Sequence, residues 1–311
     1  MAGTSPTVSI VLPTHDGSRF LGQAVQSCLG QTFRDLELIV VDDASTDCTA
    51  TLLHEHALSD KRLTVLRNQD NRGLPASLNR GFSAASGRYL TWTSDDNWYR
   101  PGALQAMLSF LDGHPTVDLV YADHTVVHEH PFLEEARTCE PAENLTEVNV
   151  VQACFLFRRS LLEKLGDHDE SLACAEDYDY WLRAQVEGFL LAPLHQDLYV
   201  YRLHGSSLTE RQPRKVLRAT FLTLQHHLTR LPLASPLQRA RGHQRLAELA
   251  RELGDLPAFR RHLLRSLLAS PAVPFRRRRS RRSPLLNFFT FAFGFQATER
   301  LRKLRHRHEV H

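Results

Sequence analysis

Short apolar runs and longer amphipathic stretches alternate along the chain up to about residue 205. Runs rich in β-branched residues, such as residues 7–13, are typical of strands buried in a sheet. Between the runs, apolar residues recur every three or four positions, as in residues 19–29, which predicts amphipathic helices. The predicted strands are "TVSIVLP", "LELIVVDD", "RLTVLRN", "RYLTW", "VDLVYAD" and "LYVYRLH". This alternation predicts an α/β fold with a mainly parallel sheet that helices cover on both faces.

Residues that start or stop helices predict several element boundaries. Ser45 is a candidate N-cap after the second strand, and Gly87 is expected to end the helix that begins near Leu74. Pro101 is expected in the first turn of the next helix, where proline loses no hydrogen bond. The segment "CFLFRRSLLEKLG" predicts a strand that runs into a helix, and residues 175–187 predict a helix with an acidic first turn.

From about residue 213 the pattern becomes purely helical. The segment "RLAELARELGDLPAFRRHLLRSLLASP" resembles one tetratricopeptide-like hairpin, with Gly254 and Asp255 at its turn. A single copy does not make a repeat array. The predicted organisation is an α/β domain over residues 1–210, a helical hairpin extension over 211–272, and a basic, aromatic tail over 273–311.

The composition is that of an ordinary globular protein, with 42% hydrophobic residues. The five cysteines are odd in number and form no CxxC pair, which favours buried thiols in a reducing compartment over a zinc site. The N-terminus lacks a basic segment followed by an apolar core, so no signal peptide is expected. No apolar stretch reaches the roughly 18 residues that a membrane-spanning helix needs. Together these features predict a cytoplasmic protein.

Charge is distributed unevenly along the chain. The formal net charge is +3, but residues 276–311 alone carry eleven Lys and Arg against two acidic residues. Five phenylalanines interrupt this basic tail between residues 288 and 295. Such a segment binds nucleic acid, binds an anionic membrane or stays solvated. Because the rest of the chain is net negative, we favour peripheral association with the inner face of the plasma membrane. No nucleic-acid partner is expected.

Polar side chains follow three of the predicted strands, at the end where open parallel sheets bind ligands. They are Pro13, Thr14, His15 and Asp16 after the first strand, Asp42 and Asp43 after the second, and Ser94, Asp95, Asp96 and Asn97 after the fourth. Adjacent carboxylates repel each other unless a cation or hydrogen-bond donors compensate. Asp96 is therefore a candidate ligand for Mg²⁺ or Mn²⁺, and Asp95 a candidate acceptor for a sugar hydroxyl. The structural alternative is that these pairs cap helices and form turns.

Two common nucleotide-binding motifs are missing from the sequence. No GxGxxG follows the first strand, which argues against a dinucleotide-binding domain, and no GxxxxGK[ST] occurs, which argues against a P-loop NTPase. Without a glycine-rich cradle, the phosphates of a nucleotide must be neutralised in another way. A divalent cation at the acidic strand ends would neutralise them.

Three segments of the chain together resemble family 2 glycosyltransferases of the GT-A fold. They are "VSIVLPTHDGSRFLGQAVQSCLGQTFRDLELIVVDDASTDCT", "NRGLPASLNRGFSAASGRYLTWTSDDN" and "AEDYDYWLR". The resemblance covers residues 7 to about 205. It implies a Rossmann-like GT-A domain whose strand ends bind a nucleoside diphosphate sugar, commonly UDP- or dTDP-linked. It also implies inverting transfer of the sugar to an acceptor hydroxyl.

The resemblance implies roles for the acids at the strand ends. Asp42 and Asp43 would contact the base of the nucleotide. The DxD element, here Ser94, Asp95 and Asp96, would contact the ribose and the metal-bound diphosphate. Ser94 replaces the first acid of that element, which leaves Asp96 as the safest metal ligand.

Three further side chains near the strand ends each have two interpretations. His204 lies where family members often carry a histidine near the metal or diphosphate, or it is a core or surface residue. His15 stands where family members usually have Tyr or Phe beside the base, so stacking is favoured over metal binding. Arg72 and Arg80 follow the third strand. Each either contacts the base or a phosphate of the nucleotide, or is a solvated helix residue.

Asp177 is the candidate catalytic base, because Glu176 and Asp177 match the acidic pair that opens a late helix in the family. A carboxylate in a first helical turn is stabilised as the anion by free N–H groups. This effect makes it a weaker base, so positioning of the acceptor and the departing diphosphate must contribute. For Asp179 the preferred role is to complement the helix dipole, and for Trp181 it is core packing.

The sequence thus predicts an inverting, metal-dependent glycosyltransferase that uses a glycan or lipid-linked acceptor in cell-surface polysaccharide or glycoconjugate synthesis. One alternative is a nucleotidyltransferase of related fold, which should carry a Gly-rich basic loop after the first strand. The other alternative is a catalytically silent, nucleotide-binding scaffold. Intact acids at all three positions argue weakly against the scaffold.

Overall fold

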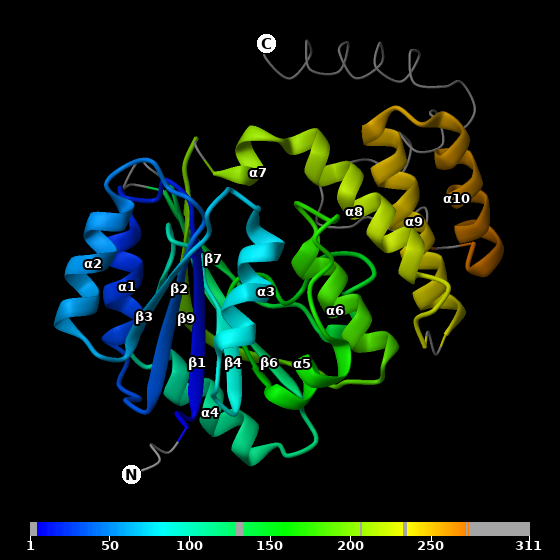
Figure 1. The fold of residues 1–311 in the computed structure, drawn as a ribbon. Helices are drawn as coiled ribbons and strands as arrows, with labels where there is room; N and C mark the ends of the chain where they lie inside the picture. Colours follow the sequence, from blue (N-terminus) through cyan, green and yellow to red (C-terminus); the bar gives the residue numbers. More distant parts are fainter. Residues whose placement is uncertain (1–4, 129–132, 206, 233–234, 272, 274–311) are drawn as a thin grey trace. The chain divides into compact units, whose positions relative to one another are not determined.

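The computed structural model describes residues 5–128, 133–205, 207–232, 235–271 and 273 (Figure 1). These residues fall into two compact units. The sheet unit comprises the described residues of 1–145 and 149–211, and the helical unit comprises those of 146–148 and 212–311. The domain boundaries predicted after residues 210 and 272 stay predictions. The basic tail over 276–311 lies outside the described residues.

The sheet unit is built on one mixed sheet with the strand order β3-β2-β1-β4-β8-β6-β9-β5, to which β7 is added beside β6. The strands β1, β2, β3 and β4 are parallel, as are β6 and β9, while β8, β5 and β7 pair with their neighbours in antiparallel fashion. The strands are β1 (Val8–Thr14), β2 (Leu36–Asp42), β3 (Leu63–Arg67), β4 (Tyr89–Trp92), β5 (Trp98–Tyr99), β6 (Leu119–His128), β7 (Glu134–Arg137), β8 (Phe155–Arg158) and β9 (Leu191–Leu203). All predicted strands are present; β5 and β7 were not predicted.

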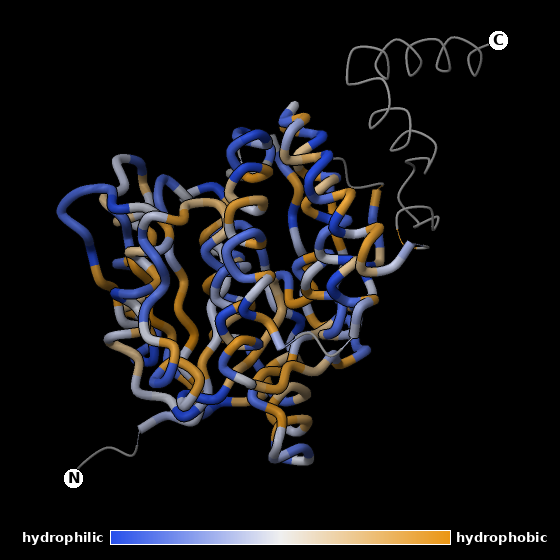
Figure 2. The backbone as a smooth tube through the Cα atoms, turned by 90° about the vertical axis from the view of Figure 1, so that its right-hand side faces the viewer, coloured by the Kyte–Doolittle hydropathy of each residue, from blue (hydrophilic) through white to orange (hydrophobic). Residues whose placement is uncertain are grey.

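Helices cover both faces of this sheet, as the alternating pattern predicted. Side chains at alternate positions of β1, Val8, Ile10 and Leu12, share a core with α1 and α4, and Figure 2 shows the apolar residues running along the strands. Val11 points to the opposite face, where it lies against Gly81 of α3. The helices of the unit are α1 (Leu21–Leu29), α2 (Thr49–Ser59), α3 (Leu74–Ala84), α4 (Ala103–Gly113), α5 (Arg159–Leu165), α6 (Glu176–Val186) and α7 (Leu208–Arg211), with a 3₁₀ turn, η1, at Ala142–Asn144.

Three predicted boundaries are wrong, each for a structural reason. Ser45 does not cap α2, which begins at Thr49; its hydroxyl instead accepts a hydrogen bond from the Asp16 amide. Gly87 lies beyond the end of α3, and a Cβ there would come within 2.6 Å of the Ser9 backbone nitrogen on β1. Pro101 precedes α4 by two positions rather than lying in its first turn. The boundaries at Ser45 and Gly87 were decided by contacts between elements, which the sequence does not display.

The helical unit contains α8 (Pro213–His227), α9 (Pro236–Leu253) and α10 (Leu256–Ala269). The predicted hairpin is confirmed, with Gly254 in the left-handed region at a φ of +83° and the Asp255 side chain accepting a hydrogen bond from the Ala258 amide at 2.9 Å. At the start of α9, Ser235 and Gln238 form a capping box. Within the described part of the chain, no helix combines the length and apolarity required to cross a bilayer.

Candidate active site

The sheet order brings three sequence-distant loops to one edge. Strand β1 lies between β2 and β4, so the residues that follow these strands emerge next to one another. Thr14 is the register partner of Asp42, and the Asp43 amide donates to the Thr14 carbonyl at 2.8 Å. On the other side, the Thr14 hydroxyl donates to the Asp95 carboxylate at 2.5 Å. Thr14 therefore links both acidic pairs, whereas Pro13 lies buried within β1.

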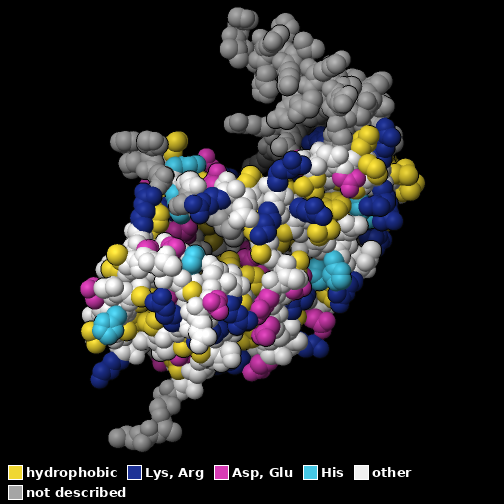
Figure 3. Space-filling view, turned by 45° about the horizontal axis from the view of Figure 1, so that its top comes forward, with side chains coloured by type: hydrophobic (Ala, Val, Ile, Leu, Met, Phe, Trp, Pro, Cys, Tyr) yellow, Lys and Arg dark blue, Asp and Glu magenta, His cyan; other side chains and the backbone are white. Residues whose placement is uncertain are grey.

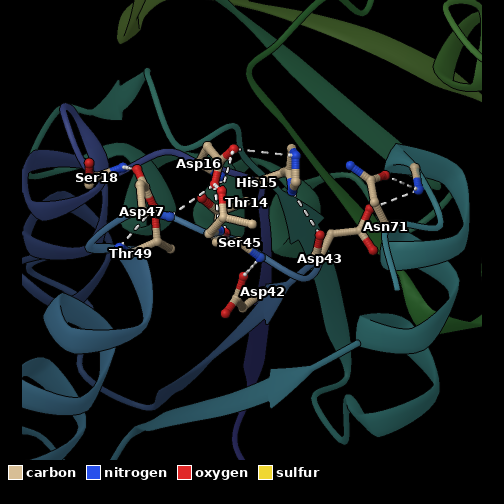
Figure 4. Close-up of polar contacts among 12 residues, drawn as sticks. Thr14, His15, Asp16, Ser18, Asp42, Asp43, Ser45, Asp47, Thr49 and Asn71 are labelled. Atoms are coloured by element: carbon tan, nitrogen blue, oxygen red, sulfur yellow. Dashed lines mark hydrogen bonds and ion pairs between the residues drawn. The ribbon is translucent and has the colours of Figure 1, made fainter. Parts of the chain in front are cut away.

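The loops after β1 and β2 are joined by side-chain contacts (Figure 4). The Asp16 carboxylate accepts hydrogen bonds from the amides of Thr46 and Asp47 at 2.7 and 3.2 Å, and the first of these bonds is the main reason that its pKa is lowered. His15 Nδ1 lies 2.8 Å from the Asp43 carbonyl oxygen. His15 is therefore held at the rim of the site by its ring nitrogen, and its other nitrogen lies 3.6 Å from Asp16.

Asp42 and Asp43 are almost fully buried, and protein groups satisfy both. Asp42 accepts a hydrogen bond from the Ser45 amide at 2.9 Å and forms an ion pair with Arg67 at 3.2 Å. Asp43 accepts hydrogen bonds from the Asn68 side chain and from the amides of Arg72 and Gly73, at 2.6, 2.9 and 2.7 Å. These contacts shape the loops around the site, which is the structural role that the sequence left as the alternative. A contact with the base of a nucleotide stays a prediction.

Arg72 contributes its amide to Asp43, while its guanidinium forms an exposed ion pair with Glu170 at 3.3 Å. Arg80 binds the Arg67 carbonyl at 2.8 Å and the Asn68 side chain. In this structure both arginines therefore tie neighbouring segments together. Ser94, half-buried between β4 and the acidic pair, accepts a hydrogen bond through its carbonyl from Thr93 at 3.4 Å.

Asp95 is held as a buried carboxyl group behind the β1 loop. Burial, reinforced by the neighbouring charge of Asp96, raises its pKa to about 6, although the Thr14 hydrogen bond favours the ionised form. A side chain at Gly17 would collide with both the Asp95 carboxylate and the Thr14 hydroxyl. Glycine at position 17 is thus required for the loop to approach Asp95.

Asp96 faces the opposite way and meets His204, with 2.8 Å between Asp96 Oδ2 and His204 Nε2. The other carboxylate oxygen, Oδ1, is buried and has no hydrogen-bond partner among the described residues. A buried carboxylate oxygen without a donor is costly, and a hard cation would compensate it. A carboxylate suits Mg²⁺ or Mn²⁺, whereas an imidazole is more typical of transition metals, so the pair suits Mn²⁺ better than Mg²⁺. Since no group of three or more acidic, His or Cys side chains in the described part could hold an ion, further ligands would have to come from a diphosphate or water.

Arg202 holds the loop that carries Asp96, and the sequence analysis did not identify it. Its guanidinium lies 4.3 Å from the ring centre of Phe20 and 4.8 Å from that of Trp98. Its Nε donates to the Asp96 carbonyl at 3.0 Å and its amide donates to the Asn97 side chain at 2.8 Å. The signal in the sequence is weak: Arg202 lies near the end of β9 and His204 directly follows it, but nothing indicates that β9 returns beside β5.

Glu176 and Asp177 open α6, as predicted, but their environment differs from the expectation. Burial raises the pKa of Asp177 and raises that of Glu176 to about 7. The predicted weakening of the base by the helix terminus is therefore wrong, because loss of hydration outweighs the favourable amides. The amide of Tyr178 donates to Asp177 Oδ1 at 2.6 Å, and the amide of Cys174 donates to Glu176 at 2.8 Å.

Asn149 is the second residue that the sequence analysis missed. Its Nδ2 donates to Asp177 Oδ2 at 2.8 Å, and no hydrogen-bond partner for its buried Oδ1 occurs among the described residues. No motif marks Asn149, which lies 28 positions before Asp177. Trp181 is fully buried against Phe155, as predicted, whereas Asp179 forms an ion pair with Arg183 at 2.8 Å.

Comparisons with known proteins relate the chain to a family and a fold. Residues 9–166 match the model of glycosyl transferase family 2. An uncharacterized glycosyltransferase of Rickettsia typhi is 30% identical over 217 residues, which are 66% of each chain. The uncharacterized glycosyltransferase EpsJ of Bacillus subtilis is 29% identical over 66% of this chain and 63% of its own length. The chain thus spans somewhat less than two thirds of the length of these curated relatives.

Solved structures share the fold at low sequence identity. The TarS 1–349 structure of S. aureus in complex with UDP-GlcNAc has a TM-score of 0.68 at 17% identity, covering 96% of this chain and 92% of its own. The mannosyltransferase PcManGT from Pyrobaculum calidifontis, in complex with GDP-Man and Mn²⁺, has a TM-score of 0.60 at 17% identity, covering 95% and 86%. The predicted GT-A fold is confirmed.

Proposed function

Because this chain belongs to glycosyl transferase family 2, we propose that it is an inverting, metal-dependent glycosyltransferase. It would move a sugar from a UDP- or dTDP-type donor to an acceptor hydroxyl. The observation that carries this proposal is the Asp96–His204 pair in the loop after β4, with a buried carboxylate oxygen for which the described residues offer no donor. The chemistry of that pair suits a cation bound to a diphosphate.

The donor would lie across the edge formed by β2, β1 and β4. Asp42, Asp43 and Arg72 would surround the base together with His15, and Pro13 and Thr14 would form the floor. Ser94 and Asp95 would contact the ribose and sugar. UDP-GlcNAc in TarS and GDP-Man in PcManGT support a nucleotide-sugar donor for this chain as well.

Asp96 and His204 would hold Mg²⁺ or Mn²⁺ in this proposal. When bound, the cation supplies positive charge to the diphosphate leaving group. Arg202 holds the backbone of Asp96 in place from behind, by its hydrogen bond to the Asp96 carbonyl. The two protein ligands are thus fixed by one loop and one strand.

Asp177 would remove the proton from the attacking acceptor hydroxyl. Its raised pKa brings it closer to neutral pH, where a general base works most effectively. Asn149 orients the carboxylate by donating to Oδ2. Glu176 lies beside it with a pKa of about 7, and a proton on Glu176 relieves the repulsion between the two groups.

The acceptor in this proposal is a glycan or a lipid-linked sugar of cell-surface polysaccharide or glycoconjugate synthesis. A lipid-linked acceptor would require access to a membrane. The basic, aromatic tail over 276–311 would provide it by peripheral attachment, since Arg clusters attract anionic lipid and phenylalanines insert at the interface.

A panel of nucleotide sugars, measured by thermal shift with and without Mn²⁺, tests the proposal. We expect one UDP- or dTDP-sugar to raise the unfolding midpoint in the presence of the cation and to be slowly hydrolysed. Cation-dependent binding without transfer or hydrolysis, even with added acceptors, would indicate a silent scaffold. If no nucleotide sugar stabilises the protein, the proposed donor class is wrong.

A further inference from the structure

The two units of the chain carry opposite charge. Residues 1–211 contain 16 basic and 30 acidic residues, whereas residues 212–271 contain 11 basic and three acidic residues. The excess of positive charge is therefore present in the folded helices, before the basic tail begins. In Figure 3, Lys and Arg side chains (dark blue) lie next to hydrophobic side chains (yellow) over the helical unit at the upper right.

One side of α10 concentrates both kinds of side chain. We call it the outer face of α10, and it consists of the exposed residues Arg260, Arg261, Leu264, Arg265 and Leu268. Leu264 is 50% exposed and Leu268 is 78% exposed. Positions 260, 264 and 268 are four apart, as are 261 and 265, so the five residues form one stripe along the helix. Phe259, His262 and Leu263 are buried on the other side, so the hairpin core does not use the outer face.

We propose that the outer face of α10 docks on the surface of an anionic lipid bilayer. Three arginines supply charge complementarity to lipid headgroups, and two leucines beside them reach the apolar boundary below. No salt bridge to these arginines occurs among the described residues, so their charge is available. The inference does not depend on the proposed sugar transfer.

Other occupants fit this face less well. A second copy of the chain would bring arginines against arginines, and like charges repel. A nucleic acid would engage the arginines through its phosphates but would gain little from Leu264 and Leu268. The leucines therefore distinguish a lipid surface from a soluble polyanion.

Vesicle co-sedimentation of the full chain tests the proposal, with lipid titrated through the half-bound point. The vesicles contain phosphatidylcholine alone or with phosphatidylserine. We expect R260Q/R261Q/R265Q to weaken binding to anionic vesicles by about fivefold per arginine at low salt. We expect L264S/L268S to weaken it by about tenfold, with little dependence on salt. The basic tail is intact in every variant, so differences between variants report on α10.

The matched control is K61Q/R88Q/K164Q, which removes three exposed positive charges from the sheet unit. Its binding should stay within about twofold of the parent, because these three charges are not part of the outer face of α10. Unchanged binding of both α10 variants would overturn the proposal. Loss of binding in the arginine variant alone, with transfer of the protein to a single-stranded RNA competitor, would identify a polyanion site instead and would also overturn it.

Discussion

Burial shifts the pKa values of histidines in both units, and in the sheet unit it also shifts those of carboxyl groups. In the sheet unit, Asp95, Glu176 and Asp177 are carboxyl groups whose pKa values burial raises. In the helical unit, burial lowers the pKa values of His243 and His262, that of His262 to about 4. Their Nδ1 atoms lie 3.3 Å apart between α9 and α10.

Histidines and carboxyl groups differ in the free energy that their burial costs near neutral pH. A neutral imidazole needs no counterion at a helix interface, and the unpartnered atom here among the described residues is a neutral nitrogen, His262 Nε2. Carboxyl groups with raised pKa values cost free energy when they ionise, and Asp96 Oδ1 has no donor among the described residues, so this unit is destabilised unless a ligand compensates. The comparison therefore points to the sheet unit as the place where ionisable groups lower the stability of the fold, as is expected at a site for binding and chemistry.

Among the variants considered, removal of the candidate metal ligand in the sheet unit should have the largest effect. Asp96→Asn should reduce turnover by about 10³-fold or more, since a cation at a leaving group supplies several kcal/mol to the transition state. Cation-dependent UDP or dTDP binding should disappear in calorimetry. Asp112→Asn makes the same chemical change at an exposed position of α4. It should leave both turnover and cation-dependent nucleotide binding unchanged. Equally tight, cation-dependent binding in the Asp96 variant would remove Asp96 from the metal site.

Substitution of the candidate base should give the next largest effect. Asp177→Asn should lower turnover by roughly 10²–10⁴-fold while donor affinity changes little, because general-base catalysis contributes that range. The unfolding midpoint should be unchanged or higher, since the amide does not pay the desolvation cost of a buried carboxylate. Transfer kinetics and thermal unfolding, measured on the same preparation, distinguish a loss of catalysis from a change in stability. Near-normal turnover would show that Asp177 serves only its helix.

A smaller effect is expected at Asn149, which donates to Asp177. Asn149→Leu removes a hydrogen bond that favours the ionised carboxylate, so the pKa of the base should rise further. Because the base acts when ionised, the acidic limb of the pH profile of kcat should move up by about one unit. Turnover at neutral pH should fall by about tenfold.

Asn149→Gln keeps the amide donor and serves as the matched control. A purely structural role for Asn149 would change stability without moving the pH profile. The profile of kcat therefore distinguishes positioning of Asp177 from packing of the loop. An unshifted acidic limb in Asn149→Leu contradicts the positioning role.

Protonation of the His243–His262 pair should have the smallest effect on stability, and only at acidic pH. The folded-state pKa of His262, about 4, lies below the unfolded value of about 6.5, so the unfolded state binds more protons between these values. The stability of the helical unit should therefore be fully present above pH 6.5 and should decrease by about 1–3 kcal/mol as the pH falls towards 4. Arg261 and Arg265 on the same helix oppose protonation, while Asp255 favours it.

Hydrogen exchange of α9 and α10 at pH 5 and pH 7.5, corrected for intrinsic rates, measures this change. His262→Leu should abolish most of the acid sensitivity, whereas His226→Gln, an exposed position on α8, should not. Equal protection at both pH values in the parent protein would show that the pair is not buried as neutral imidazoles. The contrast between the two units would then fail.

Several features of this protein were determined by the sequence itself. The period of two in strands and of about 3.6 in helices is local, so the α/β alternation and the α9–α10 hairpin could be predicted. The acids at the strand ends could also be placed, because parallel strands of one sheet end at the same edge. The resemblance to family 2 glycosyltransferases was visible in motifs that each lie within a few tens of residues.

The contacts that give the site its chemistry were decided only by the tertiary structure. His204 reaches Asp96 from 108 positions away because β9 returns beside β5, where Val200 is the register partner of Trp98. The same return places Arg202 behind the loop that carries Asp96. The pKa of Asp177 was predicted with the wrong physical cause, since the sequence displays the helix terminus but not the burial that outweighs it. Burial and long-range pairing are properties of the whole fold, and no local pattern encodes them.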